Sequence, residues 1–131
     1  MVQRTLSWMA LAGAVVLALP GMAMAEKPKA NDGMVVDSKG MTLYTYSDDT
    51  ADKSACYDKC AQNWPPALVG ASDTESENGD WTILTRTDGK KQWVLMGSPL
   101  YTYVGDKKKG DMTGDGKAQG KWATATMDGA D

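Results

Sequence analysis

The residues best suited to chemistry in this chain are its two cysteines, Cys56 and Cys60. Four positions apart on a helical turn, their Cα atoms would lie about 6 Å apart, a separation that a disulfide tolerates. An even number of cysteines in an exported chain is typical of a structural cross-link. The alternative is a redox pair, although thiol oxidoreductases have two residues between their cysteines and this chain has three. We therefore predict a Cys56–Cys60 disulfide that holds a local loop.

The absence of histidine limits the reactions open to this chain. Histidine is the commonest general base and metal ligand, and it activates many serine and cysteine nucleophiles. A zinc or Cu(II) site of the usual imidazole type therefore cannot be built, and haem attachment, which needs a histidine after the second cysteine, is excluded. We predict that the protein is not an enzyme, and we assign it no catalytic residue and no cofactor.

An acidic loop near the C-terminus resembles the start of a calcium-binding loop. Asp111, Thr113 and Asp115 supply oxygen atoms at its first, third and fifth positions, and Gly116 follows at the sixth. The glutamate that closes such a loop is missing, because Trp122 occupies its position. The other interpretation is a pair of ordinary Asp-Gly turns. We keep Asp111, Thr113 and Asp115 as candidate metal ligands.

One short string occurs twice in the sequence, and each copy is followed by an aspartate and then by a tryptophan. The copies are Gly40-Met41-Thr42-Leu43-Tyr44-Thr45-Tyr46, with Asp49 and Trp64, and Gly97-Ser98-Pro99-Leu100-Tyr101-Thr102-Tyr103, with Asp106 and Trp122. Self-similarity of this kind predicts one small structural unit used twice.

The tyrosines of the two strings have two interpretations. Side chains alternate along a strand, so Leu43 and Thr45 would face one way and Tyr44 and Tyr46 the other. A tyrosine surface formed in this way could receive a peptide, a glycan or a quinone-like ring. The alternative is that the rings build the core, because the chain has no phenylalanine and few aliphatic residues. The candidate binding residues are Tyr44, Tyr46, Asp49, Tyr101, Tyr103 and Asp106.

The first segment of the chain has the features of an export signal. In residues 1–25, Arg4 precedes the apolar run 6–19, and Ala23-Met24-Ala25 offers the small residues that signal peptidase reads. The run is shorter than the roughly 20 residues of a membrane-spanning helix. We predict a signal peptide over residues 1–25, a periplasmic or secreted product, and no stable membrane insertion after cleavage.

The charge of the chain argues against a nucleic-acid partner. Its formal net charge is −3, whereas nucleic-acid binding leaves a basic footprint. The one basic run, residues 107–109, is interpreted as a solvated loop tip. The ligand or envelope protein that would be the partner is not identified by the sequence.

The elements that must position these residues are mostly extended. Residues 26–32 are polar and are predicted to be a flexible leader. A short helix is predicted over residues 54–61, with Ser54 as its N-cap and Trp64-Pro65-Pro66 at its end. Residues 70–80 are predicted to be an exposed, disorder-prone loop, and residues 105–120 a second long loop. Strands are predicted over residues 34–37, 41–46, 81–86, 92–96, 100–104 and 121–127.

These elements predict a mostly β fold. We expect a small single domain over residues 33–128, built from two degenerate β repeats with one short disulfide-bearing helix.

An ordered set of motifs resembles a known family. The motifs are Leu-Tyr-Thr-Tyr with Asp three residues on, Cys-Tyr-x-x-Cys-Ala-x-x-Trp-Pro-Pro, Asp-Gly-x-x-Gln-Trp and Gly-Asp-x-Thr-Gly-Asp-Gly. Together they resemble the bacterial secreted-repeat family of predicted lipoproteins, which is marked by a Tyr-x-aromatic-x-x-Asp motif. That motif stands here at residues 44–49 and 101–106, and the resemblance runs from about Gly33 to Ala125.

The resemblance implies an envelope protein without an assigned activity, and it carries over no catalytic residue. The chain departs from the family in lacking the lipid-attachment cysteine and in placing Ala123 after Trp122, where relatives often have histidine. We predict an exported periplasmic protein that is a non-enzymatic binding or envelope-interaction module. The alternative is a small redox- or metal-associated accessory protein that uses Cys56/Cys60 or the Asp111–Asp115 loop.

Overall fold

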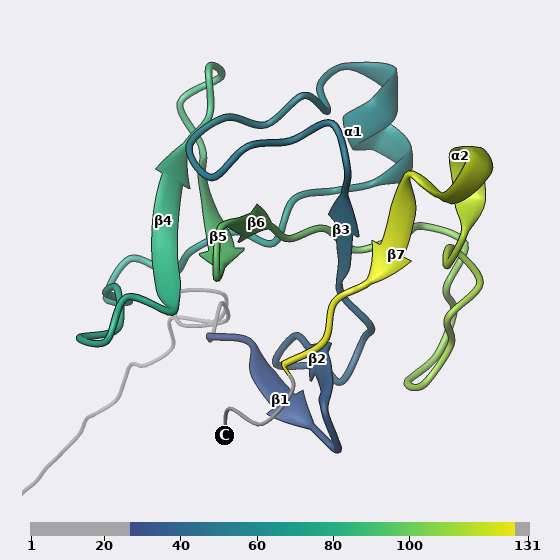
Figure 1. Cartoon of the computed structure of the whole chain (residues 1–131), viewed down its shortest axis with the longest axis horizontal. Helices are drawn as coiled ribbons and strands as arrows, with labels where there is room; N and C mark the ends of the chain where they lie inside the picture. Colours follow the sequence, from purple (N-terminus) through teal and green to yellow (C-terminus); the bar gives the residue numbers. More distant parts are fainter. Residues whose placement is uncertain (1–26, 128–131) are drawn as a thin grey trace, which may run out of the picture.

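The computed structural model describes residues 27–127, which fold into seven short strands and two short helices (Figure 1). The elements are β1 Lys29–Asn31, β2 Met34–Val36, β3 Tyr44–Tyr46, α1 Lys59–Asn63, β4 Trp81–Thr85, β5 Lys91–Leu95, β6 Ser98–Pro99, α2 Lys117–Gly120 and β7 Trp122–Thr124. The strands form three small antiparallel sheets, β1-β2, β3-β7 and β4-β5-β6. The predicted mostly β fold is confirmed. The predicted signal peptide, residues 1–25, lies outside the described residues.

The first hairpin corrects the predicted flexible leader over residues 26–32. Within that range Lys29–Asn31 forms β1, which pairs with β2 in the register Asn31↔Met34. Asp32 and Gly33 connect the strands with φ values of 56° and 83°. Two central residues with positive φ are typical of a tight hairpin turn, and Asp-Gly is a preferred pair for it. The Asp32-Gly33 pair in the sequence indicates this hairpin turn, but the polar residues before it favoured the prediction of a flexible leader.

The turn after β2 lies where the predicted strands over residues 34–37 and 41–46 require one. Asp37 Oδ1 accepts hydrogen bonds from the backbone N–H groups of Lys39 and Met41, so the side chain fixes the turn. Val36 then bridges to Thr42 as the chain returns antiparallel to β2. The chain continues into β3, whose partner is β7 from the other end of the sequence.

The β4-β5 hairpin confirms the pairing expected from residues 81–96. Five residue pairs are in register, from Trp81↔Leu95 to Thr85↔Lys91. The next turn lies at Met96 and Gly97, both with positive φ, which is one residue earlier than predicted. β6 therefore begins at Ser98, and the predicted strand over residues 100–104 is reduced to a backbone bridge at Tyr101.

The disulfide-bearing helix is shorter and later than predicted. α1 covers Lys59–Asn63, so Cys60 lies in the helix and Cys56 precedes it. Ser54 is not the N-cap, because the helix begins at Lys59 and Asp58 stands at the N-cap position. The Ser54 hydroxyl accepts a hydrogen bond from the backbone N–H of Cys56 and contacts Tyr101. The helix ends at Trp64, before the two prolines, as expected.

Two cores lie on opposite sides of β3. One contains aliphatic residues with Trp81 and Trp93, and Leu43 belongs to it. The other is almost entirely aromatic, and Tyr44 belongs to it. The predicted alternation along this strand is thus confirmed, although both of its faces are covered. Between residues 27 and 127, no helix has the length and apolar character needed to cross a membrane.

Candidate functional site

The tyrosines and aspartates of the two repeated strings form crossed pairs. The Tyr44 hydroxyl donates a hydrogen bond to Asp106 Oδ2 at 2.7 Å, and the Tyr101 hydroxyl donates one to Asp49 Oδ2 at 2.5 Å. The backbones of Tyr44 and Tyr101 also exchange two N–H···O bonds, of 2.7 and 2.9 Å. Each string therefore supplies the tyrosine for the aspartate of the other string, in a pseudo-two-fold arrangement.

Each of these aspartates also closes the loop that follows it. Asp49 Oδ1 accepts a hydrogen bond from the backbone N–H of Ala55 at 2.7 Å. Asp106 Oδ1 accepts hydrogen bonds from the backbone N–H of Thr113, at 2.9 Å, and from its hydroxyl. The Oδ2 atom of each aspartate accepts the hydrogen bond from the tyrosine of the other half. Each aspartate therefore links the loop of its own half to a buried tyrosine of the other half.

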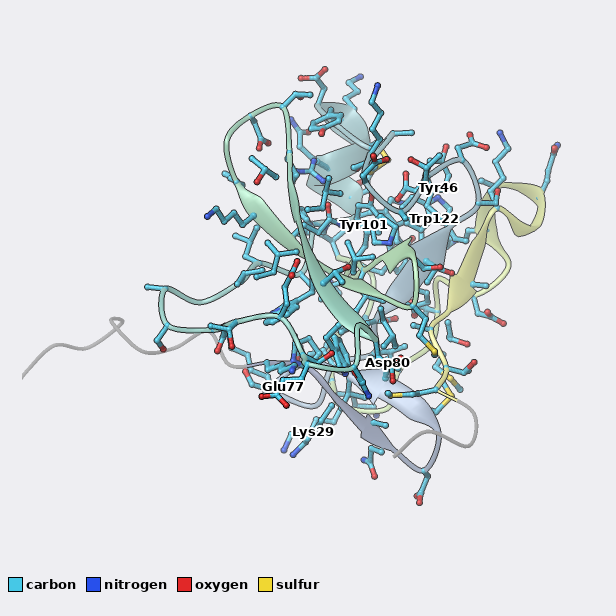
Figure 2. All side chains as sticks on the ribbon, turned by 60° about the vertical axis from the view of Figure 1, so that its left-hand side comes forward. Lys29, Tyr46, Glu77, Asp80, Tyr101 and Trp122 are labelled. Atoms are coloured by element: carbon cyan, nitrogen blue, oxygen red, sulfur yellow. A yellow bond between two sulfur atoms is a disulfide. The ribbon has the colours of Figure 1, made fainter. Side chains whose placement is uncertain are left out.

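Four aromatic rings stack in a row through the centre of the second core. Trp64 and Trp122 lie 3.8 Å apart with an interplanar angle of 2°. Tyr46 covers the outer face of Trp122, and Tyr103 covers that of Trp64, each at 4.2 Å. Figure 2 shows Tyr46, Tyr101 and Trp122 gathered at one end of the molecule. The outer tyrosine of each string thus packs on the tryptophan of the other.

The predicted tyrosine binding surface was wrong, because its residues are core. Tyr44 and Tyr101 have no exposed area, and Asp106 is 7 % exposed. Tyr46, Tyr103 and Asp49 are partly buried in the same region. The structure does bring the six candidate binding residues together, as the alternative interpretation required, but they bind one another.

A cavity of about 540 Å³ lies between the first hairpin and the loop that follows Asp106. Its walls come from the β1-β2 hairpin, the turn at residues 37–40 and the loop at residues 109–112. Lys29, Lys39 and Lys109 line it together with Met34 and Met112. Figure 2 shows Lys29 well separated from Tyr46 and Trp122. Sequence analysis missed this site, because single lysines far apart in the chain carry no motif.

A family model described as a secreted repeat of unknown function matches residues 29–68 and 82–126. The chain belongs to this family. Neither a search of curated proteins nor a search of solved structures found a match.

The two matched segments are the two halves whose aromatic residues interlock. β1, β2, β3 and α1 lie in the first, and β4 to β7 lie in the second. The unmatched stretch between them contains the predicted loop at residues 70–80, which the structure places as a series of turns. In this secreted repeat the hydrogen bonds between tyrosine and aspartate and the stacked ring contacts therefore join the two halves, whereas the edge-to-face contacts Tyr44–Trp64 and Tyr101–Trp122 lie within one half.

A buried arginine extends one of the crossed pairs, and sequence analysis missed it. Arg86 is 2 % exposed, and its guanidinium donates hydrogen bonds to Ser54 Oγ, Gln92 Oε1 and the Cys56 carbonyl. Gln92 in turn donates a hydrogen bond to the Leu100 carbonyl. A buried guanidinium requires such partners. Gln92 stood in one of the quoted motifs, and that was the available signal.

The predicted disulfide is present in the secreted repeat. The Cα atoms of Cys56 and Cys60 lie 5.2 Å apart, and Cys56 has no exposed area. Both cysteines pack against the aromatic core. The position favours the structural role of the cross-link that the spacing predicted.

The candidate metal ligands are directed to separate hydrogen bonds. Asp111 Oδ2 accepts hydrogen bonds from the backbone N–H groups of Lys107 and Lys108, and Asp115 Oδ1 accepts one from Thr124. The hydrogen bond from Lys107 is the main reason why the pKa of Asp111 is lowered. Thr113 binds Asp106. Over the described range the structure holds no cluster of three or more His, Cys, Asp or Glu that could bind a metal. The hydrogen bonds of Asp111 and Asp115 favour the interpretation of this loop as ordinary turns over a calcium loop.

Alkaline titration should report the crossed pairs. Burial and then the hydrogen bond to aspartate raise the pKa of the Tyr44 and Tyr101 phenols above their ordinary value of about 10. Because the folded pKa is the higher one, this stability is fully present below pH 10 and is lost as the pH rises further. We expect the phenolate absorbance of these two tyrosines to appear only as the protein unfolds at alkaline pH, followed in parallel by circular dichroism.

The same titration in denaturant is the control, since all five tyrosines should then ionise near their ordinary pKa. Complete phenolate absorbance from a protein with native circular dichroism would contradict the assigned burial.

Proposed function

We propose that this secreted repeat is a non-enzymatic binding module of the periplasm and that the cavity between the β1-β2 hairpin and the 109–112 loop is its ligand site. The carrying observation is the cavity itself, which lies where elements of both halves meet. Its volume of about 540 Å³ falls within the range of small-molecule sites. The cavity supports a bound small molecule rather than an extended peptide or a flat protein surface.

The walls of the cavity are held in place by hydrogen bonds from side chains. Asp37 fixes the turn that carries Lys39, and Asp111 fixes the loop that carries Lys109. β1 and β2 pair along their full length and supply the third wall. A site with preformed walls loses little conformational entropy when it binds, and this favours affinity.

The phenol and thiol groups that could take part in a reaction instead make structural contacts in the second core. The phenols of Tyr44 and Tyr101 are paired with carboxylates, and Cys56 is buried in its disulfide. This use of the reactive side chains supports binding without chemistry at the cavity.

Methyl NMR of the mature protein with ¹³C-labelled methionine tests the proposed site. We expect members of a fragment library of acids, alcohols and amines that bind the protein to shift Met34 and Met112, which line the cavity. Met96 is 51 % exposed and does not line it, so its signal should stay in place. Fragments that shift Met96 alone would place binding elsewhere.

Filling the cavity gives a matched pair of variants. Ser38 is an exposed residue of the cavity wall, whereas Ser72 is exposed in the loop at residues 70–80. Ser38→Trp should suppress the shifts of Met34 and Met112, and Ser72→Trp should leave them unchanged. Equal binding by both variants would remove the cavity as the site.

A further inference from the structure

The charge around the cavity is opposite to that of the chain as a whole. Lys29, Lys39 and Lys109 line the cavity with one aspartate, Asp32, whereas the full chain has a net charge of −3. Between residues 27 and 127, the ion pairs join Arg86 to Asp88 and Lys121 to Asp48, so none of the cavity lysines is engaged in an ion pair. Three ammonium groups around one hollow attract an anion.

Lys109 reaches the cavity because the residue that it crosses, in the turn at residues 37–40, is Gly40. A Cβ at Gly40 would come within 2.9 Å of Lys109 Cγ and 3.0 Å of its Cδ. The absence of a side chain at Gly40 therefore lets the aliphatic part of Lys109 lie across the turn. Gly40 has φ +87°, which is also a conformation that favours glycine. The aliphatic part of Lys109, in the second half, thus packs against the lysine-bearing turn of the first half, while residues 107–109 are exposed, in agreement with the predicted solvated loop tip.

Part of the remaining wall of the cavity is apolar. Met34 and Val36 alternate with Val35 along β2, and they line the cavity while Val35 packs in the core. Met112 lines the cavity from the second half and is 51 % exposed. Thioether side chains adapt to ligands of varied shape.

We propose that the ligand is an amphipathic organic acid, with its acid group held by Lys29, Lys39 and Lys109 and its aliphatic body against Met34, Val36 and Met112. This inference rests on the proposed function and names the ligand class of that site. The lysines surround a hollow in an otherwise acidic molecule, and this arrangement favours a single small anion over an anionic membrane surface. The acid group is a carboxylate or a phosphate monoester, since an ammonium group binds either.

Calorimetry and methionine methyl NMR with four ten-carbon probes test the ligand class. We expect decanoate and decyl phosphate to bind the mature protein and to shift Met34 and Met112. Decanol and decyltrimethylammonium should bind at least about tenfold more weakly, because they lack the charge-assisted hydrogen bonds. Preference for decyl phosphate over decanoate would indicate a lipid-derived phosphate, and the reverse preference a free carboxylic acid.

Lysine variants identify the groups that hold the acid. Lys39→Gln and Lys109→Gln should each weaken decanoate binding by about tenfold. Lys90→Gln is the control, because Lys90 is exposed in the β4-β5 turn and does not line the cavity. Equal losses in all three variants would show that only the net charge of the protein matters and would overturn the assigned contacts.

Three other outcomes show whether the acid, the binding site or both must be given up. Equal binding of decanol and decanoate, with shifts of Met34 and Met112, would overturn the acid and keep the binding module. A cavity whose methionine signals respond to no probe and to no library fragment would remove both. Co-sedimentation with anionic phospholipid vesicles that is lost in Lys39→Gln would assign the lysines to a membrane surface instead.

Discussion

The variant Asp106→Ala is expected to lower the free energy of unfolding by about 2–4 kcal/mol, because the buried Tyr44 hydroxyl left without a partner costs about 1–3 kcal/mol and the lost, partly buried hydrogen bonds from Thr113 add a smaller amount. The carboxylate accepts hydrogen bonds from the Tyr44 hydroxyl and from two groups of Thr113. Tyr44 is fully buried, so water cannot replace the lost acceptor. Urea denaturation followed by tryptophan fluorescence measures the change.

Two variants give the comparison for this effect. Asp49 accepts only two hydrogen bonds and is partly exposed, so Asp49→Ala should cost less than Asp106→Ala. Asp52 is exposed in the loop that follows Asp49, and Asp52→Ala should change stability by less than about 1 kcal/mol. If Asp106→Ala were no more harmful than Asp52→Ala, the crossed pair would have no structural role.

A double-mutant cycle isolates the hydrogen bond between the halves. Tyr44→Phe and Asp106→Asn change the two partners with little loss of volume. Residues in direct contact show coupling energies of about 0.5–3 kcal/mol, whereas distant residues are additive. We expect coupling for this pair, and we expect additivity between Tyr44→Phe and Asp49→Asn, because Asp49 pairs with the other tyrosine.

The second large effect is expected at the centre of the ring stack. Trp122→Ala removes a ring that contacts Trp64 and Tyr46 face to face and Tyr101 edge to face. Trp122 is 3 % exposed, and truncation of a buried tryptophan costs about 3–5 kcal/mol. Thermal unfolding should show a much lower melting temperature for this variant, and Trp122→Phe, which keeps an aromatic ring, should lose less.

Circular dichroism gives a specific signature of the same stack. Two parallel indole rings 3.8 Å apart couple their electronic transitions, which produces a paired positive and negative band. Trp64→Phe and Trp122→Phe should reduce this band to the same extent, since their contribution requires both indoles, and the Trp81–Trp93 pair, 5.9 Å apart, accounts for the part that remains. A band of unchanged amplitude in both variants would show that Trp64 and Trp122 are not stacked in solution.

The sequence predicts the local structure of this protein better than its long-range contacts. The alternation of Leu43 and Tyr44 follows from the geometry of a strand, and the Asp88-Gly89 turn follows from its residue types. Alternation assigns a side chain to a face but does not say what covers that face. The cover of Tyr44 comes from residues of the other half, so a buried core could be taken for a binding surface.

The cavity also depends on long-range contacts that the sequence does not predict. Lys29, Lys39 and Lys109 lie in three separate segments, and each is an ordinary surface lysine by sequence. Only the pairing of β1 with β2 and the contact between Lys109 and Gly40 place them around one cavity. The sequence singles out the Asp111–Asp115 loop for its oxygen atoms. In the structure Asp111 instead fixes the shape of the loop that carries Lys109.

The crossed pairs have a consequence for the order in which this secreted chain can fold. The hydrogen bonds between tyrosine and aspartate join residues 52 and 62 positions apart, and the backbone partners of β3 are β7 and Tyr101, both in the second half. Contacts of such long sequence separation form late and slowly. The first half therefore cannot close its aromatic core until the second half, up to its last strand, is present, so we expect the two halves to fold together as one cooperative unit.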